Sequence, residues 1–123
     1  MSGPIRSFLP QAFVRDMLAS IAFYEKLGFS LGNSFTPDGA AAPTWCWLSS
    51  ERGDLMLGTA REPGVPEQQS VLFYAYCDDI GATHAELAAA GIEVGPITMP
   101  FYNPGGEFQI TDPDGYLIWI AQI

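Results

Sequence analysis

Two segments of the chain repeat one hydrophobic spacing, with apolar side chains recurring every three or four positions. In the segment 16–29 these positions are Met17, Ile21, Tyr24 and Leu27. In the segment 79–92, which lies 63 positions later (79 − 16), the equivalent positions are Ile80, His84, Leu87 and Ala90. Such spacing puts each set on one side of a helix. We therefore predict two helices that each pack through one face.

The two predicted helices also share their start and stop signals. Asp16 and Asp79 open the segments, and an aspartate there accepts hydrogen bonds from the free backbone amides of the first turn. Gly28 and Gly91 close them, where glycine tolerates the left-handed conformation that ends a helix. The two helices should therefore have equal lengths.

Segments rich in β-branched and aromatic residues surround each helix and predict strands. One strand precedes each helix, at 8–14 and 70–77, and Pro10 predicts that the first is an edge strand or is bulged. Three strands follow each helix, at 29–35, 44–49 and 55–59 in the first half and at 92–99, 107–111 and 116–122 in the second. The sequence therefore predicts an α+β fold built from two tandem β-α-β-β-β modules.

The chain length of 123 residues fits a single domain made of modules 8–59 and 70–122. Between them, the segment 60–69 has no periodicity and carries Pro63, Gly64 and Pro66, which is typical of a linker. The first residues contain no secretory signal, and no apolar stretch approaches membrane-spanning length. We predict a cytoplasmic protein with no membrane partner.

Charge and cysteine content narrow the function classes. The chain has 14 acidic and 5 basic residues, a net charge of −9, so its field repels phosphates and favours cationic partners. Nucleic acid is therefore not an expected ligand. Cys46 and Cys77 both lie in apolar stretches, where cysteine is usually a small buried hydrophobe and not part of a disulfide or a zinc site.

Two motifs resemble a known family. VRDMLASIAFYEKLGF at 14–29 and EFQITDPDGYLIWIAQ at 107–122 are similar to the first strand end and helix, and to the last hairpin, of the vicinal oxygen chelate superfamily, also called the glyoxalase/bleomycin resistance/dioxygenase superfamily. The resemblance implies one curved, mostly antiparallel eight-stranded sheet with the helices on its convex face and a ligand cup on its concave face. It also implies that the protein is bacterial-like and that it forms a homodimer.

The resemblance also bears on metal binding, because metal-dependent members place His or Glu at four concave positions. The matching positions here hold Leu9, Leu72 and Trp119, and the fourth falls within 55–58, where every residue is unsuitable for a hard cation. The chain thus resembles the metal-free branch, typified by the bleomycin resistance proteins, which sequester a drug without transforming it. We expect no metal ligand, no cofactor and no catalytic residue.

Strand alternation predicts what lines the cup: if Leu72 points inward, Tyr74 and Tyr76 do so too. An aromatic lining suits flat, conjugated or cationic ligands. Glu107 and Gln109 share one strand face beside the loop that carries Tyr102 and Asn103, and they could orient a polar or cationic group at the rim. The predicted ligand-binding residues are Gln11, Phe13, Trp45, Trp47, Met56, Tyr74, Tyr76, Tyr102, Glu107 and Trp119.

Three function classes remain in competition. The favoured one is a binding module for an aromatic or cationic small molecule such as an antibiotic. The second is a lyase, isomerase or dioxygenase with a metal at atypical ligands such as Glu107, Gln11 or Cys46. The third is a dimerising module whose cup is filled by its own side chains, and a dimer interface could also bury Trp45 and Trp47. The lone histidine, His84, is interpreted as a packing residue on the second helix.

Overall fold

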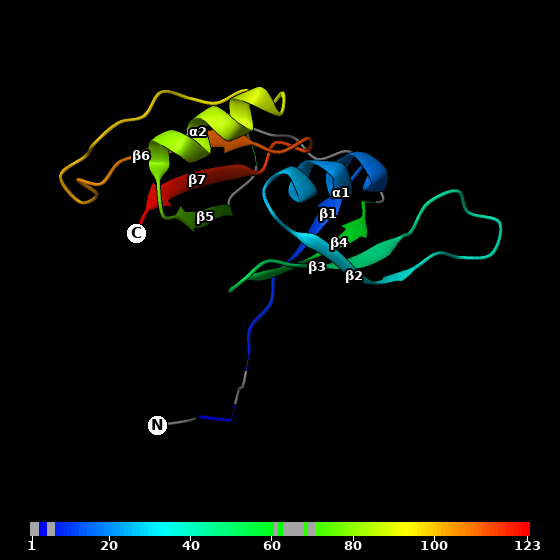
Figure 1. The fold of residues 1–123 in the computed structure, drawn as a ribbon. Coiled ribbons are helices and arrows are strands. Elements are labelled where there is room, and N and C mark those ends of the chain that lie inside the picture. The colour runs from blue at the N-terminus through cyan, green and yellow to red at the C-terminus, as the bar shows by residue number, and fades with distance from the viewer. Residues whose placement is uncertain (1–2, 5–6, 61, 63–67, 69–70) are drawn as a thin grey trace. The chain divides into compact units, whose positions relative to one another are not determined.

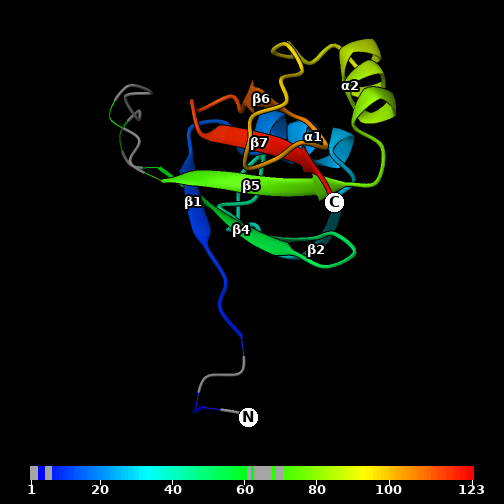
Figure 2. The same cartoon turned by 90° about the vertical axis from the view of Figure 1, so that its left-hand side faces the viewer.

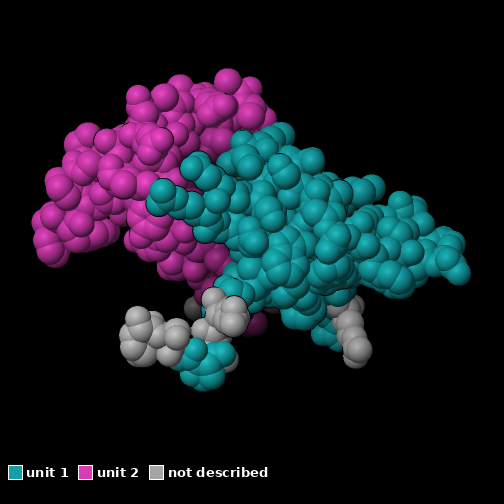
Figure 3. Space-filling view, turned by 60° about the horizontal axis from the view of Figure 1, so that its bottom comes forward, with its two compact units in different colours: residues 1–63 teal, residues 64–123 magenta. Residues whose placement is uncertain are grey.

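A computed structural model of the chain describes residues 3–4, 7–60, 62, 68 and 71–123. Its residues form two compact units, 1–63 and 64–123, which Figure 3 distinguishes by colour. Most of the predicted linker, 60–69, lies outside the described residues. No helix in the described part of the chain is long and apolar enough to cross a membrane.

The first unit is a four-stranded sheet with one helix (Figure 1). Its elements are β1 (Gln11–Val14), α1 (Met17–Lys26), β2 (Ser30–Phe35), β3 (Trp45–Ser49) and β4 (Asp54–Thr59). The strand order is β1-β4-β3-β2, with β1 parallel to β4 and the other pairs antiparallel. Pro10 directly precedes β1, an edge strand of this sheet, as predicted.

The second unit is a three-stranded sheet with one helix. Its elements are β5 (Leu72–Cys77), α2 (Ile80–Ala89), β6 (Glu107–Thr111) and β7 (Leu117–Gln122). The strand order is β5-β7-β6, in which β5 and β7 run side by side in parallel (Figure 2) and β6 is antiparallel to β7. The α+β class is confirmed, but the strands described form two separate sheets and not the single eight-stranded sheet that was predicted.

The helix boundaries follow the predicted signals in both units. The Ala19 amide donates to the Asp16 carboxylate at 3.0 Å, and the Ala82 amide donates to the Asp79 carboxylate at 3.0 Å. After the helices, Gly28 and Gly91 have φ angles of 104° and 87°. These values lie in the region that favours glycine, which explains why both helices stop there.

One predicted strand is absent: the segment 92–99 forms no strand in the described structure. Its contacts with β6 are a single bridge between Thr98 and Glu107 and a 2.9 Å hydrogen bond from the Gly95 amide to the Gln109 carbonyl. The physical reason is Pro96, which has no amide hydrogen to donate to a strand ladder. The residues have strand-like composition, but the ladder is interrupted.

Each sheet has one face covered by its helix and one face that is more open. Along the strands, the buried residues alternate with exposed or half-buried ones, and the buried ones form the core with the helix. The largest buried strand side chains are Leu48, Leu57, Phe108 and Ile110. We call the opposite side of each sheet its open face. Met17, Ile21 and Tyr24 of α1 and Ile80 and Leu87 of α2 are buried, which confirms that each helix packs through one side.

Candidate functional site

The open face of the first unit carries five of the predicted ligand-binding residues. They are Gln11, Phe13, Trp45, Trp47 and Met56. In the first row across this face, Met56 of β4 lies between Gln11 of β1 and Trp47 of β3. The Trp47 indole donates a hydrogen bond to the Asp54 carboxylate at 3.2 Å. Its polar edge is therefore satisfied within the protein, and the indole is held in one orientation.

A second row across the same face has an aromatic residue on each side of a glycine. Gly58 of β4 lies between Phe13 of β1 and Trp45 of β3. A Cβ atom at Gly58 would lie 2.7 Å from Nε2 of Gln11 and 3.4 Å from the Phe13 ring, so glycine makes room for both side chains. The Phe13 side chain is 56% exposed. This row presents apolar ring surface to any molecule that lies on the open face.

The open face of the second unit has a corresponding row of residues. Trp119 of β7 lies between Tyr74 of β5 and Gln109 of β6. One step along β5, the Tyr76 ring stacks on the Tyr74 ring, with their centroids 6.2 Å apart and their planes 23° apart. Tyr74 and Tyr76 are both exposed. Three predicted site residues, Tyr74, Tyr76 and Trp119, thus lie on neighbouring strands of the open face.

Glu107 lies in the next row but is almost completely covered, with 1% of its surface exposed. Its carboxylate accepts hydrogen bonds from the Tyr102 hydroxyl at 3.0 Å and from the Asn103 amide at 3.3 Å. The hydrogen bond from Tyr102 and the negative charge of Glu107 raise the pKa of the Tyr102 phenol. Although Glu107 was predicted as a ligand contact, in this arrangement its carboxylate positions the loop residues Tyr102 and Asn103.

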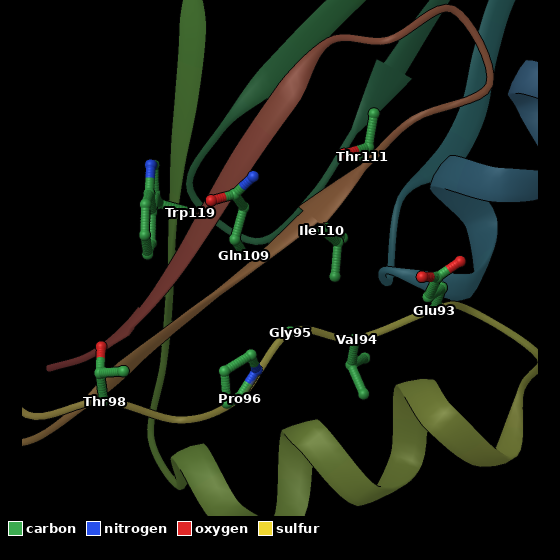
Figure 4. Close-up of a pocket in the computed structure, with 9 residues that line it drawn as sticks. All are labelled: Glu93, Val94, Gly95, Pro96, Thr98, Gln109, Ile110, Thr111 and Trp119. Carbon is green, nitrogen blue, oxygen red and sulfur yellow. The ribbon is translucent and has the colours of Figure 1, made fainter.

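A pocket of about 520 Å³ opens in the second unit where the segment 92–99 fails to continue the sheet. Thr98, Gln109 and Trp119 contribute to its wall from three different segments (Figure 4). The full lining is Glu93, Val94, Gly95, Pro96, Thr98, Gln109, Ile110, Thr111 and Trp119. Of the predicted site residues, Trp119 alone belongs to this set. Gln109 was expected at the rim of the cup. Sequence reasoning missed the lining residues of 92–99 because it treated that segment as a strand, and the Gly95-Pro96 pair was the signal that could have revealed the break.

His84 supports one wall of this pocket from the helix side. Its Nε2 atom lies 2.8 Å from the Gly95 carbonyl oxygen, and its ring packs edge-to-face on Phe108, with centroids 4.9 Å apart. The interpretation of His84 as a packing residue is confirmed. His84 therefore fixes the backbone at Gly95, which forms part of the pocket wall, and its own side chain does not line the pocket.

The residues present do not fit a divalent metal. The positions matched to the family's ligands hold Leu9, Leu72 and Trp119, and no three His, Cys, Asp or Glu side chains of the described chain come together. Glu107 and Cys46, two of the atypical ligands considered from the sequence, do not fit a metal either. The Glu107 carboxylate is engaged by its loop, and Cys46 is buried with its thiol 3.8 Å from the sulfur of Met17. Burial raises the pKa of the Cys46 thiol, which disfavours the thiolate that a metal needs.

Comparison with known proteins identifies the family. The family model for the glyoxalase/bleomycin resistance protein/dioxygenase superfamily matches residues 8–120. A bleomycin resistance protein of Klebsiella pneumoniae is 31% identical over 118 residues, which cover 88% of this chain and 85% of that protein.

Two solved structures show the same fold. A bleomycin-binding protein crystallised with bleomycin has a TM-score of 0.74 at 21% identity, covering 97% of this chain and 99% of that one. An antibiotic-binding protein from a Streptomyces species has a TM-score of 0.72 at 23% identity, covering 98% of both chains. At these identities the likeness concerns the fold, and the ligands belong to those proteins.

Proposed function

Since this chain belongs to the glyoxalase/bleomycin resistance protein/dioxygenase superfamily, we propose that it binds and sequesters a flat, aromatic or cationic small molecule, such as an antibiotic of the bleomycin type. The observation that carries the proposal is the pair of open faces, on which aromatic side chains from neighbouring strands lie in register. No bond-making step is required of the protein, and no metal takes part.

The rings on the open faces support binding because much of their surface is exposed. Phe13 is 56% exposed, Tyr74 47% and Tyr76 65%. Aromatic faces stack on planar groups and attract cations, at about 0.5–2 kcal/mol per contact. The pocket of about 520 Å³ is also large enough for a ligand, since small-molecule sites span roughly 300–1,000 Å³. These features favour a binding module over a domain filled by its own side chains.

The same residues favour binding over catalysis. His84 faces the backbone of Gly95 from the helix side, and the Glu107 carboxylate is occupied by Tyr102 and Asn103. Neither group is placed to move a proton to or from a ligand on the open face. The proposal includes a homodimer in the cytoplasm, in which Trp45 and Trp47 serve either the ligand or the interface between subunits.

Titration with metal-free bleomycin tests this function. We expect saturable binding and thermal stabilisation, by about 2.7 kcal/mol at a ligand concentration one hundred times the dissociation constant. Trp119→Leu should weaken binding, whereas Leu18→Ala, on the exposed side of α1, is the control and should not.

Mass spectrometry of the recovered drug separates the two leading function classes. Sequestration predicts that bleomycin returns unmodified after long incubation with the protein. A chemically altered drug would contradict sequestration and favour an enzyme, and absence of saturable binding would remove bleomycin as the ligand.

A further inference from the structure

We infer that the pocket beside β6 takes an elongated cation, with a flat ring against Trp119 and an ammonium or guanidinium group near Glu93. The inference rests on the proposed function, because it names the ligand class for one part of the second unit's open face. It goes further in assigning a charge-selecting residue, Glu93, that aromatic stacking alone does not require.

The charge of the lining selects for a cation. The nine residues around the pocket supply one carboxylate, that of Glu93, and the described lining contains no Lys, Arg or His. Glu93 is exposed and makes no hydrogen bond or ion pair within the described part of the chain. An anionic group entering here would meet the Glu93 charge in a protein of net charge −9, whereas a cation is attracted by both.

The spacing of the lining side chains sets the ligand's length. Figure 4 shows Glu93 and Trp119 on opposite sides of the pocket, with Gln109 between them. One chemical group therefore cannot contact both, and a ligand that uses both needs a linker between its ring and its charge. The Gln109 side chain, which makes no hydrogen bond within the described residues, is placed to accept or donate one along that linker.

The wall between these side chains is held in place before any ligand arrives. Thr98 and Glu107 exchange two backbone hydrogen bonds of 2.9 Å, and the Gly95 amide donates to the Gln109 carbonyl at 2.9 Å. From the helix side, His84 holds the Gly95 carbonyl at 2.8 Å. A wall fixed on both sides needs little ordering when a ligand binds, which favours affinity for even a small probe.

Three probes with the same ring and the same chain of methylene groups test the inference: phenylbutylamine, phenylbutanol and phenylpentanoate. Binding is followed through the indole N–H signal of Trp119 in a nitrogen-15 correlation spectrum, assigned with the Trp119→Phe variant. We expect affinity to fall in the order amine, alcohol, carboxylate. Added salt should weaken binding of the amine and leave the alcohol unchanged. Equal affinity for amine and alcohol, or no saturable shift with any probe, would overturn the inference.

Two charge variants locate the selecting residue. Glu93→Gln keeps the shape and removes the charge, and should lower the amine's affinity about two- to fivefold, as expected for one exposed ion pair, with no change for the alcohol. Glu86→Gln on the exposed side of α2 removes the same charge elsewhere and should change neither. Equal losses in the two variants would show that net charge, and not Glu93, selects the cation.

The outcomes distinguish this inference from the proposed function. Bleomycin binding without any preference among the probes would leave sequestration standing and remove the cation site. A Glu93-dependent preference for the amine without bleomycin binding would keep the cation site and remove that antibiotic as the ligand.

Discussion

The two units share one plan, but one row across their open faces carries its polar side chain on opposite sides. In the first unit, Gln11 lies on β1 and Trp47 on β3, with Met56 between them. In the second unit, Tyr74 takes the place of Gln11, and Gln109 takes the place of Trp47. The repeat therefore preserves the backbone while its side chains diverge, so that the first unit is aromatic at β3 and the second is polar at β6.

A pair of equivalent glycines shows how the pocket arises. A Cβ at Gly32 would lie 3.3 Å from the Trp47 carbonyl oxygen, and one at Gly95 would lie 3.2 Å from the Gln109 carbonyl oxygen. Both glycines let their segment approach the neighbouring strand closely. The next residue is Asn33 in the first unit, where β2 continues, and Pro96 in the second, where no strand forms. One proline therefore accounts for the edge strand of one unit becoming the pocket wall of the other.

The largest contrast is expected inside the cores. Cys46 and Phe108 hold equivalent places on β3 and β6, and both are fully buried. Phe108→Ala should lower the free energy of unfolding by about 3–5 kcal/mol because a large cavity replaces the ring under His84. Cys46→Ala should cost about 1 kcal/mol. Denaturant unfolding measures both, and similar losses would mean that the two helix-covered faces are not packed as described.

The helix ends should behave alike in the two units. Gly28→Ala and Gly91→Ala should each cost about 1–2 kcal/mol, since both glycines have positive φ and side chains disfavour the left-handed region. Nothing lies within 4 Å of the added methyl at either site, so the cost is one of backbone conformation. Gly81→Ala, inside α2, is the matched control and should stabilise the protein by up to about 1 kcal/mol. A Gly91→Ala variant as stable as the unaltered protein would contradict the view that both helices end through a glycine with positive φ.

The tryptophans of the two open faces should differ in their hydrogen bonding. Trp47→Phe loses the 3.2 Å hydrogen bond to Asp54 and should cost about 1 kcal/mol more than Trp119→Phe, because the Trp119 indole makes no such bond within the described residues. Thermal unfolding of both variants, beside Asp54→Ala, measures the difference. If Asp54→Ala does not reproduce the extra loss, the bond to Asp54 contributes nothing.

The smallest effect concerns the loop contact of the second unit, where Glu107 stands at the position of Trp45 in the first. Because the hydrogen bond to Glu107 raises the pKa of the Tyr102 phenol, Glu107→Gln should lower that pKa. The contribution to stability is present below the ordinary tyrosine pKa of about 10 and is lost as the pH rises through the raised pKa of the folded state. Absorbance titration, with Tyr102→Phe to assign the transition, checks this, and an unchanged pKa in Glu107→Gln would refute the contact.

Local signals made much of the fold predictable from the sequence. Asp16, Asp79, Gly28 and Gly91 mark helix ends through contacts within a few residues, and strand alternation correctly separated the helix-covered from the open face. The division into two sheets was not predictable, because hydrogen bonds between distant strands leave no local pattern. The break at Pro96 was visible but outweighed by the apolar residues around it.

The candidate site was less predictable because side chains from separate loops determine how exposed the strand residues are. Alternation put Glu107 on the open face, yet the contacts from Tyr102 and Asn103 cover it. Glu93 was missed for the opposite reason, since a residue in a supposed strand became part of a pocket. Conformation outside regular elements is set by tertiary contacts that one sequence does not display.

The most direct test of the central claim uses the chain's three tryptophans, Trp45, Trp47 and Trp119, all of which lie on open faces. A nitrogen-15 correlation spectrum is recorded while metal-free bleomycin is added. We expect saturable shifts of the Trp119 indole signal and of at least one other indole, while the imidazole signals of His84, on the helix-covered side, stay in place. Saturable binding that moves the His84 signals and leaves all three indoles unchanged would contradict it.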